Sequence, residues 1–291
     1  MLKRINWKRV LISFIWLLSL SGLGVLMSFI EVKKGDARCK EVRIIIPGTY
    51  NFIERTEVDN ILYKTQGPLK GRVLNRINIQ ELETALRANP FIRTARVFTD
   101  MDGVITVLVN QREPILRVLN LTNQDFYIDR DGYKIPTSSN FTARVLAANG
   151  FVLEGFTNKV DTLKTQMARD LFKTASFIEQ DSLWRDQIEQ LYVNQQNEIE
   201  MVPRVGNHKI ILGNADSLQT KFRNLLVFYK KALPKVGWDA YKTINIKYYN
   251  QVVCEKADST ELEKEKLADT SVTGSPDSIN DIQDTSKIIT H

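Results

Sequence analysis

The chain has few of the residues that most often bind metals or carry out catalysis: its 291 residues include two histidines and two cysteines. His208 and His291 have no second ligand at the spacing of a zinc site, so the sequence predicts no metal centre. Cys39 and Cys254 allow at most one bridge, and we expect both to stay unpaired. Cys254 lies in the run Val-Val-Cys, where a small apolar side chain packs well.

The signatures of common enzyme classes are also missing. The sequence has no G-x-S-x-G, no P-loop and no G-x-G-x-x-G, and its pair Gly22-Leu23-Gly24 lies in the apolar segment. Asp100–Gly103 and Asp129–Gly132 each resemble half of a calcium loop, but neither has an acidic residue at loop positions one and twelve. Both are therefore expected to be hairpin turns. We predict no enzymatic activity, no cofactor and no small-molecule substrate.

Charge is distributed unevenly along the chain. The formal net charge is +6, yet Met1–Arg9 has four basic residues and no acid, whereas residues 257–291 have eight acids against three lysines. This last segment is rich in Ser, Thr, Asp and Glu, so apolar burial cannot offset its chain entropy. The sequence predicts a basic stub at residues 1–9 and a disordered acidic tail at residues 257–291.

One long apolar run stands out. Val10–Ile30 has 21 residues without a charge, enough to span about 30 Å as a helix, so we expect a membrane helix at residues 10–30. A cleaved signal peptide and a buried soluble helix are the alternatives. Five basic residues follow the run and four precede it, so charge counting leaves the orientation open. Because the basic stub is short, we expect a type II topology, with most of the chain extracytoplasmic.

The residues after a linker at 31–40 predict a small α+β domain at residues 41–112. Val42–Ile46 predicts a strand, and Thr56 with Asp59 and Asn78 with Glu81 predict two helix starts. Phe91–Thr99 and Val104–Val109, joined by Asp102-Gly103, predict a hairpin. The order is β-α-α-β-β, with Ile105, Val107 and Val109 facing the helices. The edge of such a hairpin has unpaired N–H and C=O groups that an extended partner segment can join.

Residues 113–256 predict a mainly antiparallel sheet with packed helices. Short apolar runs alternate with turn pairs such as Asp131-Gly132. Helical spacing indicates one helix from about Thr162 to Phe177 and another after Gly213-Asn214 that ends at Leu233-Pro234. Basic residues surround this last helix, but they are expected to form its solvated face, so we predict no binding to nucleic acid. These residues are Lys221, Arg223, Lys230, Lys231 and Lys235.

Several motifs occur in one order along the chain. A predicted helix is joined to a strand by the motif N-P-F-I-R-T-A-R-V at residues 89–97. The next predicted strand and its end have the motif V-I-T-V-L-V-N-Q-R-E-P-I at residues 104–115. F-Y-I-D-R-D-G-Y-K-I-P at 126–136, I-I-L-G-N-A-D-S-L-Q-T-K at 210–221 and T-I-N-I-K-Y-Y-N-Q-V-V-C-E-K at 243–256 follow. Together with the basic stub and single apolar helix, these motifs resemble the FtsQ/DivIB family of bacterial cell-division proteins, including its POTRA domain. The resemblance covers roughly residues 1–256.

The resemblance implies a bitopic scaffold of the divisome in the inner (cytoplasmic) membrane at the division site, which recruits and links other division proteins. The terminal strand of this chain resembles the site at which, in the family, FtsB adds a strand to the sheet while it is held to FtsL as a coiled coil. Other partners are expected at the POTRA domain. Because the predicted tail follows at once, no later element is expected to cover the strand. The predicted partner-binding residues are Thr243, Ile244, Ile246, Lys247, Tyr248, Asn250, Gln251, Val252 and Val253.

Two functions of another class are the alternatives: a membrane-anchored extracytoplasmic enzyme and a POTRA-bearing secretion component. An enzyme requires polar groups that converge in a pocket. A secretion component is expected to carry repeated POTRA units, and this sequence predicts one. The sequence leaves open the identity, affinity and stoichiometry of the partners and the role of the tail.

Overall fold

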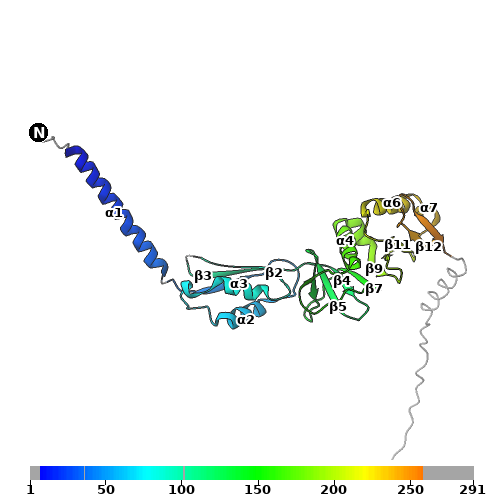
Figure 1. Cartoon of the computed structure of the whole chain (residues 1–291), viewed down its shortest axis with the longest axis horizontal. Helices are drawn as coiled ribbons and strands as arrows, with labels where there is room; N and C mark the ends of the chain where they lie inside the picture. The colour runs from blue at the N-terminus through cyan, green and yellow to red at the C-terminus, as the bar shows by residue number, and fades with distance from the viewer. Residues whose placement is uncertain (1–6, 36, 101, 258–291) are drawn as a thin grey trace, which may run out of the picture. The chain divides into compact units, whose positions relative to one another are not determined.

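The computed structural model describes residues 7–35, 37–100 and 102–257. Most of the predicted basic stub and all but the first residue of the predicted acidic tail lie outside the described residues. The chain divides into two compact units, residues 1–179 and 180–291. The described residues form a mixed α+β fold, as predicted (Figure 1).

The first helix, α1 (Trp7–Gly35), contains the predicted membrane segment. Its described side chains, those of residues 11–25, are all exposed, and many are large and apolar. Over the residues that the structure describes, no helix has both the length and the apolar character needed to cross a membrane. The membrane anchor therefore stays a prediction.

The predicted β-α-α-β-β order is confirmed in the residues that follow (Figure 1). The three strands lie in the order β1-β3-β2, with β1 parallel and β2 antiparallel to the central β3. The elements are β1 (Glu41–Ile45), α2 (Arg55–Gln66), the 3-10 turn η1 (Leu74–Arg76), α3 (Ile79–Arg87), β2 (Ile92–Thr99) and β3 (Val104–Gln111).

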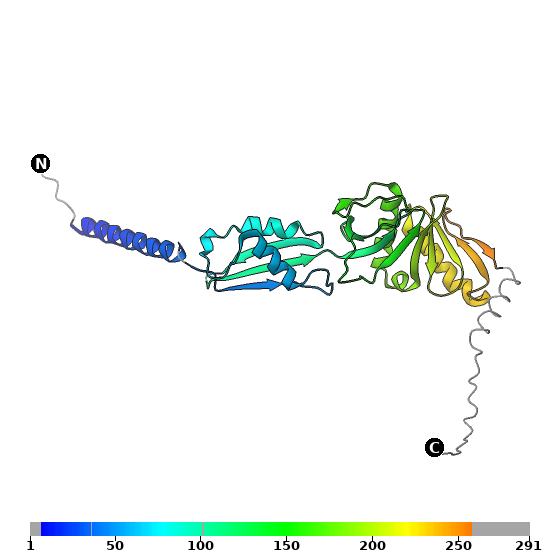
Figure 2. The same cartoon turned by 90° about the horizontal axis from the view of Figure 1, so that it is seen from below.

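One face of this sheet forms the core with both helices, which lie on the same side of it (Figure 2). Ile105, Val107 and Val109 are fully buried, which confirms the alternation predicted for this strand. They share one apolar cluster with side chains of α2 and α3, namely Val58, Leu62, Leu82 and Leu86.

The two predicted helix starts have different outcomes. Asn78 caps α3, because its side chain accepts a hydrogen bond from the Glu81 N–H at 3.2 Å. In a capping box the Glu81 side chain would accept the Asn78 N–H; here the Gln66 side chain accepts it, at 3.2 Å. The capping box predicted at Thr56 is wrong: α2 begins one residue earlier, after the extended Glu54, and Thr56 lies inside the helix.

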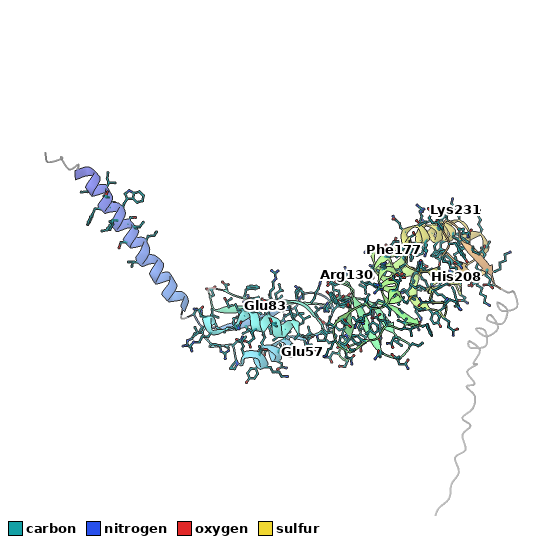
Figure 3. The ribbon with its side chains drawn as sticks, in the orientation of Figure 1. Glu57, Glu83, Arg130, Phe177, His208 and Lys231 are labelled. Atoms are coloured by element: carbon teal, nitrogen blue, oxygen red, sulfur yellow. The ribbon has the colours of Figure 1, made fainter. Side chains whose placement is uncertain are left out.

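The outer edge of β2 is less open than the sequence predicted. The Asp100 N–H bonds to the Val104 carbonyl, and because backbone groups alternate along a strand, the Val97 N–H points away from β3. Glu83 on α3 (Figure 3) accepts this N–H at 2.9 Å. A side chain thus occupies the middle of the edge that the sequence predicted to be free, so the expectation of an open hairpin edge is corrected there.

The end of the predicted linker is bonded to the first sheet and its loops. The Cys39 N–H donates to the Arg72 carbonyl at 2.8 Å, and the Gly71 N–H donates to the Cys39 carbonyl at 2.7 Å. The Lys40 N–H donates to the Gly103 carbonyl at 2.8 Å. Gly103 has a φ of +88°, and a Cβ there would lie 2.6 Å from a backbone oxygen, so this turn requires glycine. Cys39 is buried, and both cysteines are free.

The rest of the first unit contains five neighbouring strands in the order β7-β4-β5-β6-β8. Its helix begins at residue 166 and not near Thr162 as predicted, because the Thr165 hydroxyl accepts the Ala168 N–H at 3.2 Å and caps the helix there. The elements are β4 (Pro114–Leu119), β5 (Asp125–Asp129), β6 (Tyr133–Pro136), β7 (Leu146–Gly150), β8 (Asp161–Thr162) and α4 (Gln166–Gln180).

A buried ion pair fixes the segment that leads into α4. Lys134 on β6 and Glu154 are both almost fully buried, and the Lys134 Nζ lies 2.6 Å from a Glu154 carboxylate oxygen. The same carboxylate accepts the backbone N–H groups of Lys164 and Thr165 and the Thr165 hydroxyl. Burial alone would raise the pKa of Glu154, but the bonds from Lys134, Thr165 and Lys164 outweigh it and lower that pKa.

The second unit has its strands in the order β13-β12-β11-β10-β9. The pair β11 and β12 is parallel, and the other neighbours are antiparallel. The elements are α5 (Ser182–Gln187), β9 (Ile188–Val193), β10 (Ile199–Pro203), β11 (Lys209–Gly213), α6 (Leu218–Lys231), α7 (Leu233–Val236), β12 (Tyr241–Asn245) and β13 (Val253–Lys256).

The helix predicted after Gly213-Asn214 is present as α6, and its apolar stripe packs on Trp184, whose ring lies 5.0 Å from that of Phe222. Lys221 is not on a solvated face as predicted. It is buried, and its Nζ donates to the carbonyls of Leu212 and Asn214 at 3.0 and 2.9 Å. This lysine therefore satisfies one backbone carbonyl near the end of β11 and one in the loop that follows it.

We expect Lys134→Met to destabilise the first unit by about 3–5 kcal/mol, because it leaves the Glu154 carboxylate buried without its counter-ion. Hydrogen exchange followed by mass spectrometry should show faster exchange in β6 and in residues 154–166. Lys164→Met is the matched control, since Lys164 is exposed and its ion pair with Asp161 is at the surface, where water screens the attraction between the charges. Equal exchange in the two variants would contradict the role of the buried pair.

Candidate partner-binding site at the terminal hairpin

The predicted terminal strand at residues 243–253 is a hairpin in the structure. β12 ends at Asn245, and β13 begins at Val253 and returns antiparallel to β12, with Ile244 opposite Cys254. The sequence Tyr-Tyr-Asn-Gln interrupts the β-rich run: Asn250 has a φ of +56°, a conformation that asparagine adopts more readily than most residues. The prediction of one continuous strand is therefore wrong.

This change alters which strand lies at the edge. β12 has neighbours on both sides, β11 and β13. Within the described residues β13 has a partner strand on one side only, so its outer N–H and C=O groups form the edge of the sheet. The sequence prediction that no later element covers residues 243–245 is corrected, because β13 covers them.

The nine predicted partner-binding residues lie in three different settings. Ile244 and Ile246 are fully buried in the core, so their side chains cannot touch a partner. Thr243, Lys247 and Val252 are partly buried. The remaining predicted residues are exposed, on the connecting loop or at the start of β13: Tyr248, Asn250, Gln251 and Val253.

Sequence reasoning missed three exposed residues of the same region. Tyr249 is 80% exposed, more than Tyr248 at 44%, and Glu255 and Lys256 are exposed on the edge strand. The turn-forming asparagine after two tyrosines is the signal that predicts a loop here. Two neighbouring tyrosines beside an open sheet edge provide apolar area together with hydroxyl groups, a combination enriched at protein interfaces.

Lys247 connects the loop to a distant part of the second unit. Its Nζ lies 3.0 Å from a Glu198 carboxylate oxygen and 5.2 Å from the centre of the Tyr248 ring. The hydrogen bond that the Lys247 ammonium donates to Glu198 is the main reason why the pKa of Lys247 is raised. Glu198 is 49 positions away along the chain, and no local pattern predicts this contact.

The buried titratable side chains outside the terminal hairpin have structural partners. His208 is buried, with its Nε2 2.9 Å from the Tyr229 hydroxyl, and burial lowers its pKa (Figure 3). Burial also raises the pKa of Tyr229, so both groups are neutral near pH 7. The described residues contain no group of three or more His, Cys, Asp or Glu side chains able to hold a metal ion.

Two open pockets border the loop at residues 47–54 of the first unit. Their volumes are 440 and 400 Å³. Their polar lining includes Tyr50, Gln111, Glu54 and Arg55. Gln111 is already occupied structurally, since its side-chain oxygen accepts the Phe52 and Ile53 N–H groups at 2.9 and 3.1 Å. The terminal hairpin is therefore the better candidate site, and the activity that it supports is binding.

Comparison with known protein families agrees with this geometry. The model of the POTRA-like domain matches residues 37–110, and the model described as FtsQ/DivIB, C-terminal related, matches residues 113–255. No curated protein matches the chain significantly. The second match runs through the terminal hairpin almost to the end of β13. With these two domains following one another on one chain, the protein belongs to the FtsQ/DivIB family of bacterial cell-division proteins.

Proposed function

We propose that the protein is a bitopic, non-enzymatic scaffold of the bacterial divisome that links other membrane-anchored division proteins through its extracytoplasmic domains. The observation that carries the proposal is the one-sided edge of β13 beside two exposed tyrosines, within the domain matched as FtsQ/DivIB-related. An edge strand of this kind binds an extended segment by adding a strand to the sheet. Such binding needs no catalytic group.

The proposed membrane anchor is the apolar run Val10–Ile30 within α1. Two observations support it: the run has no charged residue over 21 positions, and the described side chains of residues 11–25 are exposed. Exposed apolar side chains in such number are costly in water but favourable in hydrocarbon. In the proposed type II topology, Met1–Arg9 lies in the cytoplasm and the POTRA-like domain lies next to the inner membrane.

The proposed partner at the hairpin is a coiled-coil pair like FtsB and FtsL, from which one extended segment pairs with β13. Main-chain hydrogen bonds to the edge would provide affinity, and the side chains of Tyr248, Tyr249 and Val253 would provide specificity. In this proposal the main-chain contacts are made by β13. The loop residues that the sequence predicted as partner-binding make side-chain contacts. Further partners are proposed at the POTRA-like domain.

We expect a reporter that fluoresces only after folding in the cytoplasm to stay dark when it is fused to the C-terminus, and to fluoresce when fused to the N-terminus. The physical reason is that a short basic stub is retained in the cytoplasm while a long following domain crosses. An alkaline phosphatase fusion at the C-terminus provides the matched positive signal. A bright C-terminal fluorescent fusion would contradict the type II topology.

We expect Tyr248→Ala to weaken binding of the FtsB/FtsL-like pair by about 1–3 kcal/mol, or roughly 5- to 150-fold, because buried tyrosines dominate many interfaces. The measurement is a titration of the detergent-solubilised full chain with the purified pair. Tyr192→Ala is the matched control, since Tyr192 is a tyrosine of similar exposure, 40%, on β9. Unchanged affinity in Tyr248→Ala would place the contact elsewhere.

A further inference from the structure

The Lys247 side chain spans the end of three neighbouring strands. Lys247 follows β12, and its Cβ packs directly over Gly213 at the end of β11, where an added Cβ would lie 2.9 Å from it. Gly213 is opposite Ile199, the first residue of β10, and Glu198 immediately precedes that residue. The glycine therefore opens the path along which the lysine side chain reaches Glu198.

Both ends of this ion pair are held by their own backbones. The Lys247 N–H donates to the Asn245 side chain at 3.1 Å, and the Ile246 N–H donates to the Ile211 carbonyl at 2.9 Å. The Glu198 N–H donates to the Asn194 side chain at 3.0 Å. The pair is also partly shielded from water, with the two side chains 29% and 28% exposed. Because the backbone is already fixed at both ends, forming the pair has to order only the two side chains.

The ammonium group of Lys247 makes a second contact, with the face of Tyr248. At 5.2 Å from the ring centre it lies within the range of a cation–π interaction. Tyr248 is otherwise an exposed loop residue, which would be free to adopt several rotamers. The fixed ammonium favours the rotamer in which the ring covers it.

We propose that Glu198 is a positioning residue of the docking site: by holding Lys247 across Gly213, it sets the orientation of the Tyr248 ring before a partner binds. This inference rests on the proposed function of the hairpin. If the Tyr248 ring is already oriented in the free protein, less side-chain entropy is lost when the partner binds. Glu198 then raises the affinity without contacting the partner directly.

The test is a double-mutant cycle on the full chain in detergent, titrated with the purified FtsB/FtsL-like pair. Glu198→Gln removes the charge but keeps the size of the side chain, and we expect about 3- to 10-fold weaker binding. Combined with Tyr248→Ala, it should weaken binding no further than Tyr248→Ala alone, because its effect acts through that ring. Glu200→Gln is the matched control, since Glu200 lies two residues further along, on β10, and pairs with Lys209 at 3.8 Å. As Gln it keeps a side-chain oxygen that can accept the Asn194 amide.

The outcomes separate this inference from the proposed function. If Tyr248→Ala weakens binding and Glu198→Gln binds like the parent, the positioning role is overturned and the docking site stands. If the two substitutions have independent, additive effects, Glu198 acts by another route and the inference is also overturned. If Tyr248→Ala binds like the parent, the docking site itself is wrong, and the positioning role is overturned with it.

Discussion

A strand at the edge of a sheet has a row of N–H and C=O groups without partners, and this constraint governs the two sheet edges that matter most here. At β2 the middle of the row is occupied, because Glu83 on α3 accepts the Val97 N–H. At β13 no strand among the described residues pairs with the outer side. The same physical requirement therefore closes one edge with a side chain and leaves the other as the candidate docking surface.

Three lysines serve the fold in ways that surface lysines do not. Lys134 is buried against Glu154, Lys221 donates to carbonyls at the end of β11 and just after it, and Lys247 crosses Gly213 to Glu198. Each ammonium has several donors on a long apolar stem, so it can satisfy oxygens from separate segments at once. The cost of burying charge is offset only where these oxygens are already fixed by the backbone.

Local patterns predicted much of the first sheet. Alternating apolar residues identified β3 and the face that the helices cover, and Asn78 marked the start of α3, because these signals act within a few residues. The start of α4 was less accessible. It depends on Thr165, whose hydroxyl accepts the Ala168 N–H, and on Glu154, which accepts the N–H groups of the two residues before the helix. The Glu154 contacts link residues ten or more positions apart.

Motifs in a fixed order along the chain were enough to show the resemblance to the family. Short-range periodicity predicted the β-α-α-β-β order, and the local sequence located an aromatic segment near residue 248. Only the tertiary structure decided that this segment is a loop between β12 and β13, that Ile244 and Ile246 are buried, and that Glu198 holds Lys247. The reason is physical: edge position, burial and ion pairing depend on which distant strands become neighbours. Glu198 and Lys247 are 49 positions apart, and no local pattern reports such a contact.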